Sequence, residues 1–311
     1  MSTAPSGADG VVFCFDAAYA WPACVAINSL IDTWEATDPL DIYCLCDPQV
    51  SAGARLALEA IADRGDTRLR VLDLDAPTVR THNAHVSAMT YARVHAPHLI
   101  DVDRLLYLDC DLLACTSVSA LRRPIAADYP VAAARDLYCP ELDAPHMGPR
   151  RFPFGGRAGS FPYYNAGVLL IDVARWREQR VTEQVEDLMR RPDWQPGLDD
   201  QDTLNYVLGG RVELLDPRWN VIPAGFITSS FGATSIPGNR YVPEEYQRDL
   251  ENSPWIVHYL TDRKPWLFDF RADPLGARWH IAAADTRRVL EQAGVVTPAP
   301  PMPRHKEARR E

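Results

Sequence analysis

The sequence lacks the paired cysteines that a disulfide framework or a zinc site would require. It has seven cysteines in 311 residues, an odd number, and none is arranged as Cys-x-x-Cys. Most lie in or beside apolar segments, so we expect buried free thiols in a reducing compartment, and hence a cytoplasmic protein. Cys44 and Cys46 alone suggest a metal pair. No second pair completes a zinc set, which excludes structural zinc.

Long apolar runs and an excess of positive charge are also missing. No apolar run approaches the roughly 20 residues of a membrane span, and residues 1–10 lack the basic and apolar regions of a signal peptide. We therefore expect no transmembrane segment, although peripheral membrane contact stays open. The net charge of −10 argues against broad nucleic-acid binding, which needs a basic face. Hydrophobic content of 47% and charged content of 24% indicate a globular protein with a sizeable core.

What the sequence does have is an apolar run that leads into two carboxylates. Leu105 to Leu108 predict a strand buried on both faces, and Asp109 and Asp111 follow it directly. In extended backbone their i, i+2 spacing places both on one side, at a solvent-facing strand end. The crevice beyond such ends is where open α/β sheets bind ligands. Hard oxygen ligands suit magnesium or manganese, so we predict a divalent-metal site.

The Asp-x-Asp pattern is weak by itself because it occurs four times, at 73–75, 101–103, 109–111 and 200–202. For a bare Asp-x-Asp the ordinary interpretation is a solvated loop. The buried strand that precedes Asp109 and Asp111 sets that pair apart from the others.

Strands alternate with helices, which predicts an α/β fold with a mostly parallel sheet and right-handed crossovers. The expected strands are 11–15, 41–46, 68–74, 105–108, 131–134, 168–171 and 255–258. The expected helices are 22–34, 52–64, 87–95, 173–191 (as one or two helices), 200–208 and 276–292. We expect residues 1–10 to be flexible, 11–270 to form one domain, 271–296 a helical extension and 297–311 a disordered tail. The irregular stretch 137–162 is expected to be functional or disordered.

Several motifs, taken in order, resemble the family 8 glycosyltransferases, which include glycogenin and bacterial lipooligosaccharide galactosyltransferases. They are Thr90-Tyr91-Ala92-Arg93, Tyr107-Leu108-Asp109-Cys110-Asp111, Tyr164-Asn165-Ala166-Gly167-Val168-Leu169-Leu170, Asp200-Gln201-Asp202-Thr203-Leu204-Asn205, His258-Tyr259 and Lys264-Pro265-Trp266. The resemblance covers about Val11 to Trp266. It implies a single GT-A domain with a Rossmann-like sheet, a nucleotide-sugar donor, a divalent metal and transfer with retention of anomeric configuration.

The resemblance implies His258 as a third metal ligand beside Asp109 and Asp111. A mixed carboxylate and imidazole set favours manganese, with magnesium as the alternative, because magnesium prefers all-oxygen shells. Without the resemblance, a histidine that ends an apolar strand would be interpreted as structural.

Three contacts to the donor nucleotide are also implied. Lys264 would offer its ammonium to the diphosphate, and otherwise reads as an ordinary surface lysine. Arg93 would meet the diphosphate or the sugar, and otherwise reads as a salt-bridge partner of an acidic residue. Asp16, which closes the first strand, would lie near the uracil or ribose.

Asp136, Asn165, Asp200 and Gln201 match family positions around the donor sugar, where amides and carboxylates read hydroxyl groups. Taken singly, Asn165-Ala166-Gly167 reads as a turn and Asp200 as a helix N-cap. Retention by double displacement requires a nucleophile, and Gln201 is a poor one. We therefore favour front-face attack, in which the departing phosphate accepts the acceptor's proton. The Gln201 carbonyl oxygen would stabilise the oxocarbenium-like charge.

The sequence departs from the family pattern in two places. Ala17 and Ala18 stand where further polar residues usually follow Asp16, which affects the base contacts. Thr261 stands where a glycine usually approaches the diphosphate, and threonine tolerates fewer backbone angles.

We expect a metal-dependent retaining glycosyltransferase that uses UDP-glucose or UDP-galactose. The acceptor stays open among glycan, lipid-linked sugar, small metabolite and the protein's own tyrosine, and the oligomeric state is also open. One alternative is a nucleotidyltransferase, although the Gly-rich phosphate loop expected after the first strand is missing. Another is a catalytically silent sugar- or nucleotide-binding protein.

Overall fold

A computed structural model describes residues 9–76, 87–126, 128–137, 162–226 and 244–299. The irregular stretch 137–162 lies almost wholly outside these residues. Most of the predicted flexible N-terminus and of the predicted tail does so too.

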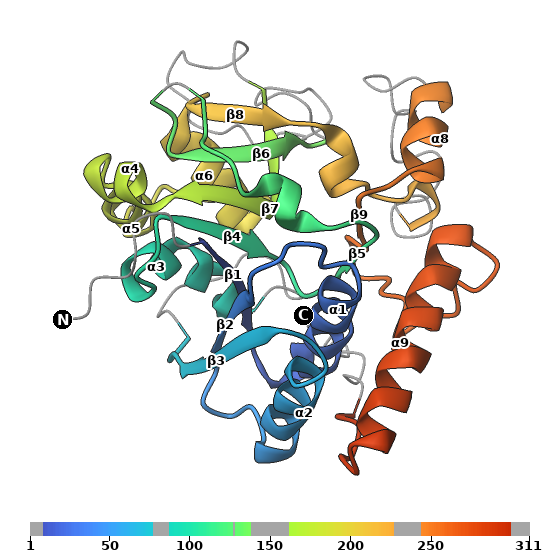
Figure 1. The fold of residues 1–311 in the computed structure, drawn as a ribbon. Helices are drawn as coiled ribbons and strands as arrows, with labels where there is room; N and C mark the ends of the chain where they lie inside the picture. The colour runs from blue at the N-terminus through green and yellow to red at the C-terminus, as the bar shows by residue number, and fades with distance from the viewer. Residues whose placement is uncertain (1–8, 77–86, 127, 138–161, 227–243, 300–311) are drawn as a thin grey trace, which may run out of the picture.

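A seven-stranded sheet forms the centre of the molecule, in the order β3-β2-β1-β4-β7-β6-β8 (Figure 1). Its strands are β1 (Asp9–Phe15), β2 (Leu40–Cys46), β3 (Thr67–Asp73), β4 (Arg104–Leu108), β6 (Val131–Arg135), β7 (Tyr164–Asp172) and β8 (Val212–Leu215). β7 pairs antiparallel with β4 and β6, and the other neighbours pair parallel. The predicted mixed, mostly parallel α/β sheet is confirmed.

Helices cover both faces of this sheet. Figure 1 shows α1 (Ala20–Asp32), α2 (Ala52–Ala62) and α9 (Pro274–Gln292) grouped together, and they contact one another. The opposite group is α3 (Ala92–Leu99), α4 (Val173–Glu178), α5 (Val181–Met189) and α6 (Asp199–Leu208). Two hydrophobic cores lie on the two faces of the sheet, and alternate residues of β1 belong to each. Val11 and Phe13 pack with the α1 group, and Val12 and Cys14 pack with the other group. This two-residue alternation is the period of a strand.

The remaining described elements are short. They are β5 (Leu112–Ala114), β9 (Ile256–His258), α8 (Glu244–Asn252), and the 3-10 helices η1 (Ala17–Tyr19), η2 (Ala88–Tyr91), η3 (Val118–Leu121) and η5 (Pro217–Asn220). β5 and β9 form a separate antiparallel pair. The sequence predictions missed β5, β8 and α8, because such short segments carry too little periodicity to be recognised.

One local prediction is corrected. Asn165-Ala166-Gly167 is not a turn, because β7 begins at Tyr164 and includes all three residues. The predicted helical stretch 173–191 forms two helices, as one of its two expected arrangements has it: α4 and α5 are divided at Arg180, whose φ of 52° is left-handed.

The predicted buried thiols are confirmed for Cys14, Cys24, Cys44, Cys46 and Cys110, which are free and buried, while Cys115 is half-buried. Within the described ranges, no helix has the length and apolar character needed to span a membrane.

Candidate active site

The candidate residues gather at one edge of the sheet because of its strand directions. β1, β4 and β6 run parallel to one another and end at this edge, whereas the antiparallel β7 begins there. Asp16, Asp109 and Asp136 follow the ends of β1, β4 and β6, and Asn165 lies near the start of β7. The edge is therefore the carboxyl end of the parallel strands, where α/β sheets bind ligands.

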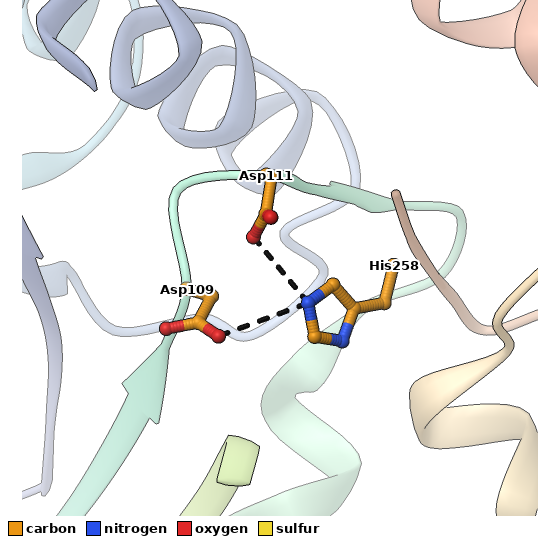
Figure 2. Close-up of side chains that lie close together, drawn as sticks. All are labelled: Asp109, Asp111 and His258. Atoms are coloured by element: carbon orange, nitrogen blue, oxygen red, sulfur yellow. Dashed lines mark ion pairs between the residues drawn. The ribbon is translucent and has the colours of Figure 1, made fainter. Parts of the chain in front are cut away.

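Asp109, Asp111 and His258 form a cluster whose potential ligand atoms all lie within 4.8 Å of one another. Figure 2 shows both carboxylates directed at the imidazole. His258 Nε2 lies 3.7 Å from Asp109 Oδ2 and 3.4 Å from Asp111 Oδ1. These two separations are short enough for the three residues to act together as ligands of one small divalent ion.

The chemistry of this cluster also fits a cation. His258 Nε2 is buried and makes no hydrogen bond within the part of the chain that the structure describes. It faces two acceptor-only carboxylates, and an unpartnered buried nitrogen there is costly. A divalent ion would satisfy all three groups at once.

The predicted convergence of Asp109 and Asp111 is confirmed, but its stated cause is wrong. β4 ends at Leu108, so the two aspartates lie in the turn between β4 and β5 and not in extended backbone. Asp111 does not face solvent either, because it is 7% exposed. The missed strand β5 positions His258: Leu112 pairs with His258 across β5 and β9, and Tyr259 N donates to Asp111 O at 2.9 Å.

Lys264 is not a surface lysine. Its side chain is buried, with Nζ donating to Asp111 Oδ2 and, at 2.9 Å, to Tyr259 O. Burial disfavours the charged form of both groups. The opposite charges and hydrogen bonds around each group favour that form, and together they outweigh burial. The pKa of Asp111 is therefore held below its usual range by Lys264 and His258, and the pKa of Lys264 is raised by Asp111.

Arg93 joins the metal cluster to the second group of candidates. It is buried and pairs with Asp109 at 2.8 Å and with Asp200 at 3.0 Å, as the salt-bridge interpretation predicted. Asp200 is not the N-cap of α6, because it lies inside the helix and its Oδ1 accepts from Thr90 Oγ1 at 2.8 Å. Burial raises the pKa of Asp200 to about 6 despite the opposing charge of Arg93.

Asp136, Asn165 and Gln201 form a hydrogen-bonded group beside this network. Asp136 Oδ2 accepts from Asn165 Nδ2 at 3.1 Å and from Gln201 Nε2 at 3.2 Å. Gln201 Oε1 accepts from Ala166 N at 3.0 Å. The structure thus joins by hydrogen bonds three of the four residues that were predicted to surround the donor sugar, whereas the fourth, Asp200, pairs with Arg93 and Thr90.

The solvent exposure expected of a bare Asp-x-Asp is found at two of the other three pairs, although Asp73 is the last residue of β3 and does not lie in a loop. The aspartates of 73–75 and 101–103 are exposed, whereas Asp200 and Asp202 are buried in the first turn of α6.

The two places where the sequence departs from the family pattern lie at the same edge of the sheet. Asp16 caps η1, which contains Ala17 and Ala18, and accepts from Ala18 N at 3.0 Å. Thr261 has a φ of 87°, a left-handed conformation that favours glycine. The backbone there retains the conformation that a glycine would supply.

The cluster of Asp109, Asp111 and His258 lies at the carboxyl edge of a mixed α/β sheet, where proteins of this fold class bind ligands such as nucleotides. The model of glycosyl transferase family 8 matches residues 10–269. The chain therefore belongs to this family, and it is a glycosyltransferase. This finding decides against the nucleotidyltransferase and the silent binding protein.

Individual relatives agree with the family. The chain is 27% identical to general stress protein A of Bacillus subtilis strain 168, over 82% of this chain and 86% of that protein. It is 29% identical to the glycosyltransferase GlyA of Streptococcus pneumoniae serotype 4, over 60% of this chain but only 23% of GlyA. A crystal structure of the galactosyltransferase LgtC with donor and acceptor sugar analogues superposes with a TM-score of 0.68 at 26% identity, covering 89% of this chain and 95% of that one. The predicted GT-A fold is confirmed.

Two residues of the site were missed by sequence reasoning. Asn220 contacts His258, but an asparagine that ends a 3-10 turn has no pattern that distinguishes it from a surface residue. Gly167 is in a quoted motif, and its close approach to His258 and Asp109 emerges only from the fold.

Proposed function

We propose that this glycosyltransferase transfers a hexose, glucose or galactose, from a UDP-sugar to an acceptor hydroxyl, with a divalent metal and retention of configuration. The convergence of Asp109, Asp111 and His258 around an unpartnered nitrogen is the observation that carries the proposal. Manganese fits this mixed ligand set best, with magnesium as the substitute. When bound, the metal would neutralise charge on the leaving diphosphate.

The protein's own residues would then bind and orient the donor. Lys264 would bind the diphosphate, and Asp16 the nucleoside. Arg93 would hold Asp109 and Asp200 in place beside the sugar. Asp136, Asn165 and Gln201 would hydrogen-bond the sugar hydroxyls, because their amides and carboxylate already face one another at the site.

Front-face attack suits the arrangement of the carboxylates. Asp136 is engaged by Asn165 and Gln201, and Asp200 by Arg93 and Thr90, so neither is presented as a nucleophile. The Gln201 carbonyl would stabilise positive charge at the anomeric carbon, and the leaving phosphate would accept the acceptor's proton.

A screen of nucleotide sugars with Mn²⁺, scored for release of nucleoside diphosphate, tests the donor and the metal. We expect UDP-glucose or UDP-galactose to give the signal, with carbohydrate, lipid-linked and small-molecule acceptors added in turn. Asp109→Asn should abolish the signal. The matched control is Asp101→Asn, an exposed aspartate at the other end of β4, which should retain it.

Proton NMR of the freshly formed product tests the stereochemistry. The linkage should be α with a UDP-α-hexose donor, because front-face attack retains the configuration. A β linkage would contradict the proposed retaining reaction.

A further inference from the structure

A buried asparagine connects the metal cluster to the sugar-binding group. Asn220 is 2% exposed and ends η5, and its amide contacts His258 on one side and Asn165 on the other. Asn165 in turn contacts Asp136. The orientations of these two amides together determine which ring nitrogen of His258 carries the proton.

The orientation of Asn165 follows from one backbone group. Gly167 N lies 2.9 Å from the Asn165 side chain, and a peptide N–H can only donate. The atom of Asn165 that faces it is therefore Oδ1. Its Nδ2 then points to Asp136 Oδ2 at 3.1 Å, where a donor is required.

The orientation of Asn220 follows in turn. Asn165 Oδ1 lies 2.8 Å from the Asn220 amide, and an oxygen that accepts must face a donor, so that atom is Nδ2. Asn220 Oδ1 is then the atom 2.9 Å from His258 Nδ1. An amide oxygen only accepts, so Nδ1 carries the proton.

The imidazole is therefore prepared for a metal. With the proton on Nδ1, a neutral ring has its lone pair on Nε2, the nitrogen that faces Asp109 and Asp111 (Figure 2). We propose that Asn220 is a positioning residue that sets the metal-binding tautomer of His258 and links it to Asp136. This inference rests on the proposed metal site.

The tautomer can be measured without metal. Long-range ¹H–¹⁵N correlations are recorded on the metal-free wild-type protein at about pH 8.5, where an ordinary imidazole is neutral. Loss of one signal set in His258→Gln assigns His258. We expect the proton on Nδ1, and a proton on Nε2 would overturn the proposal whether or not the protein binds metal.

Mn²⁺ affinity measures the consequence, by EPR of the free ion in a titration. Asn220→Ala should bind Mn²⁺ about 10–100-fold more weakly, the usual effect of losing the outer partner of a ligating histidine. Asn220→Asp should recover part of the affinity, because one carboxylate oxygen still accepts from Nδ1, whereas the other faces Asn165 Oδ1 and cannot donate to it. Asn205→Ala is the matched control. Asn205 is equally buried and bonds the backbone of Tyr164 in β7, but its described hydrogen bonds do not involve His258, so this variant should keep wild-type affinity.

The outcomes separate the two proposals. Wild-type affinity in folded Asn220→Ala, or no recovery in Asn220→Asp, would overturn the role of Asn220 alone. If Asn220→Ala does not fold, the Asn220→Asp titration and the tautomer decide. No Mn²⁺ binding by the wild-type protein would overturn the proposed metal dependence, and with it this role of Asn220.

Discussion

The side chains of His258 and Asp109 occupy the space where a side chain at position 167 would lie, which explains the glycine there. A Cβ there would lie 2.4 Å from His258 Cε1 and 3.0 Å from Asp109 Oδ2. Asn220 and Arg93 hold those two residues, so they cannot move away freely. We expect Gly167→Ala to reduce stability by about 1–3 kcal/mol in urea denaturation, as overpacking does. It should also reduce Mn²⁺ affinity at least about tenfold, as disturbed ligand positioning does.

The matched control is Gly53→Ala in α2, where an added Cβ meets no atom within 4 Å. Alanine favours the helix there, so this variant should be slightly more stable than the wild type. Wild-type Mn²⁺ affinity in Gly167→Ala would show that the cluster is not tightly packed around this glycine.

Asp111 stabilises the fold as well as the proposed metal site. Asp111→Asn would leave the ammonium of Lys264 buried without its carboxylate, and breaking such a pair costs about 3–5 kcal/mol. Because the native pKa of Asp111 is depressed, its contribution is present above the unfolded pKa of about 4 and is lost as pH falls. We expect the stability difference between wild type and Asp111→Asn, from metal-free urea denaturation, to shrink below about pH 4.

Asp202 is a control in which stability should depend on pH in the opposite direction. Burial raises its pKa to about 6, against hydrogen bonds from Tyr163 and the backbone N–H of Leu198. Its native form binds a proton more tightly than its unfolded form, so its contribution is lost as pH rises from about 4 to about 6. Asp202→Asn should therefore gain stability relative to wild type over that interval. A pH-independent difference for Asp111→Asn would contradict the buried ion pair.

At the scale of elements, the strand before Asp109 and Asp111 could be predicted because an unbroken apolar run has few other interpretations. The turn after it could not, since β5 has three residues and forms only by pairing with β9, more than 140 residues later. His258 was identifiable only through the family resemblance for the same reason. Asn220 contacts His258 only in the folded protein, and no spacing in the sequence indicates this contact.

The turn after β9 contains Thr261 in a left-handed conformation. A β-branched residue with φ of 87° is strained, at a cost on the order of 1–3 kcal/mol. Thr261→Gly should remove the strain and lose about 0.5–1 kcal/mol to chain entropy, for a net gain in stability seen as a higher melting temperature. The control is Thr33→Gly. Thr33 has a φ of −100° and no such strain, so its replacement by glycine should lower the melting temperature. A lower melting temperature for Thr261→Gly would contradict strain at this turn.

At the scale of the whole molecule, alternation of strands and helices was enough to predict six of the seven strands of the sheet. β8 was missed, and the expected strand 255–258 is β9, which pairs with β5 outside this sheet. Segment boundaries, however, do not show which elements share a core. The stretch 271–296 reads as an appended helix, yet α9 contacts α1 and α2, and its buried Trp279 belongs to the same core as β1.

Removal of α9 therefore tests whether it is an extension or part of the domain. Leu275, Trp279, Ala283 and Leu290 are buried, and Leu275 O accepts from the hydroxyl of Tyr259, the neighbour of His258. Trp279 also packs on Trp266 with ring centroids 5.5 Å apart, and Trp266 lies beside Lys264, the partner of Asp111. Deleting residues 274–311 should cost on the order of 5 kcal/mol or more and abolish cooperative urea unfolding and Mn²⁺ binding. The control deletion of 297–311 should unfold like the full chain, and a wild-type midpoint for the longer deletion would make α9 dispensable.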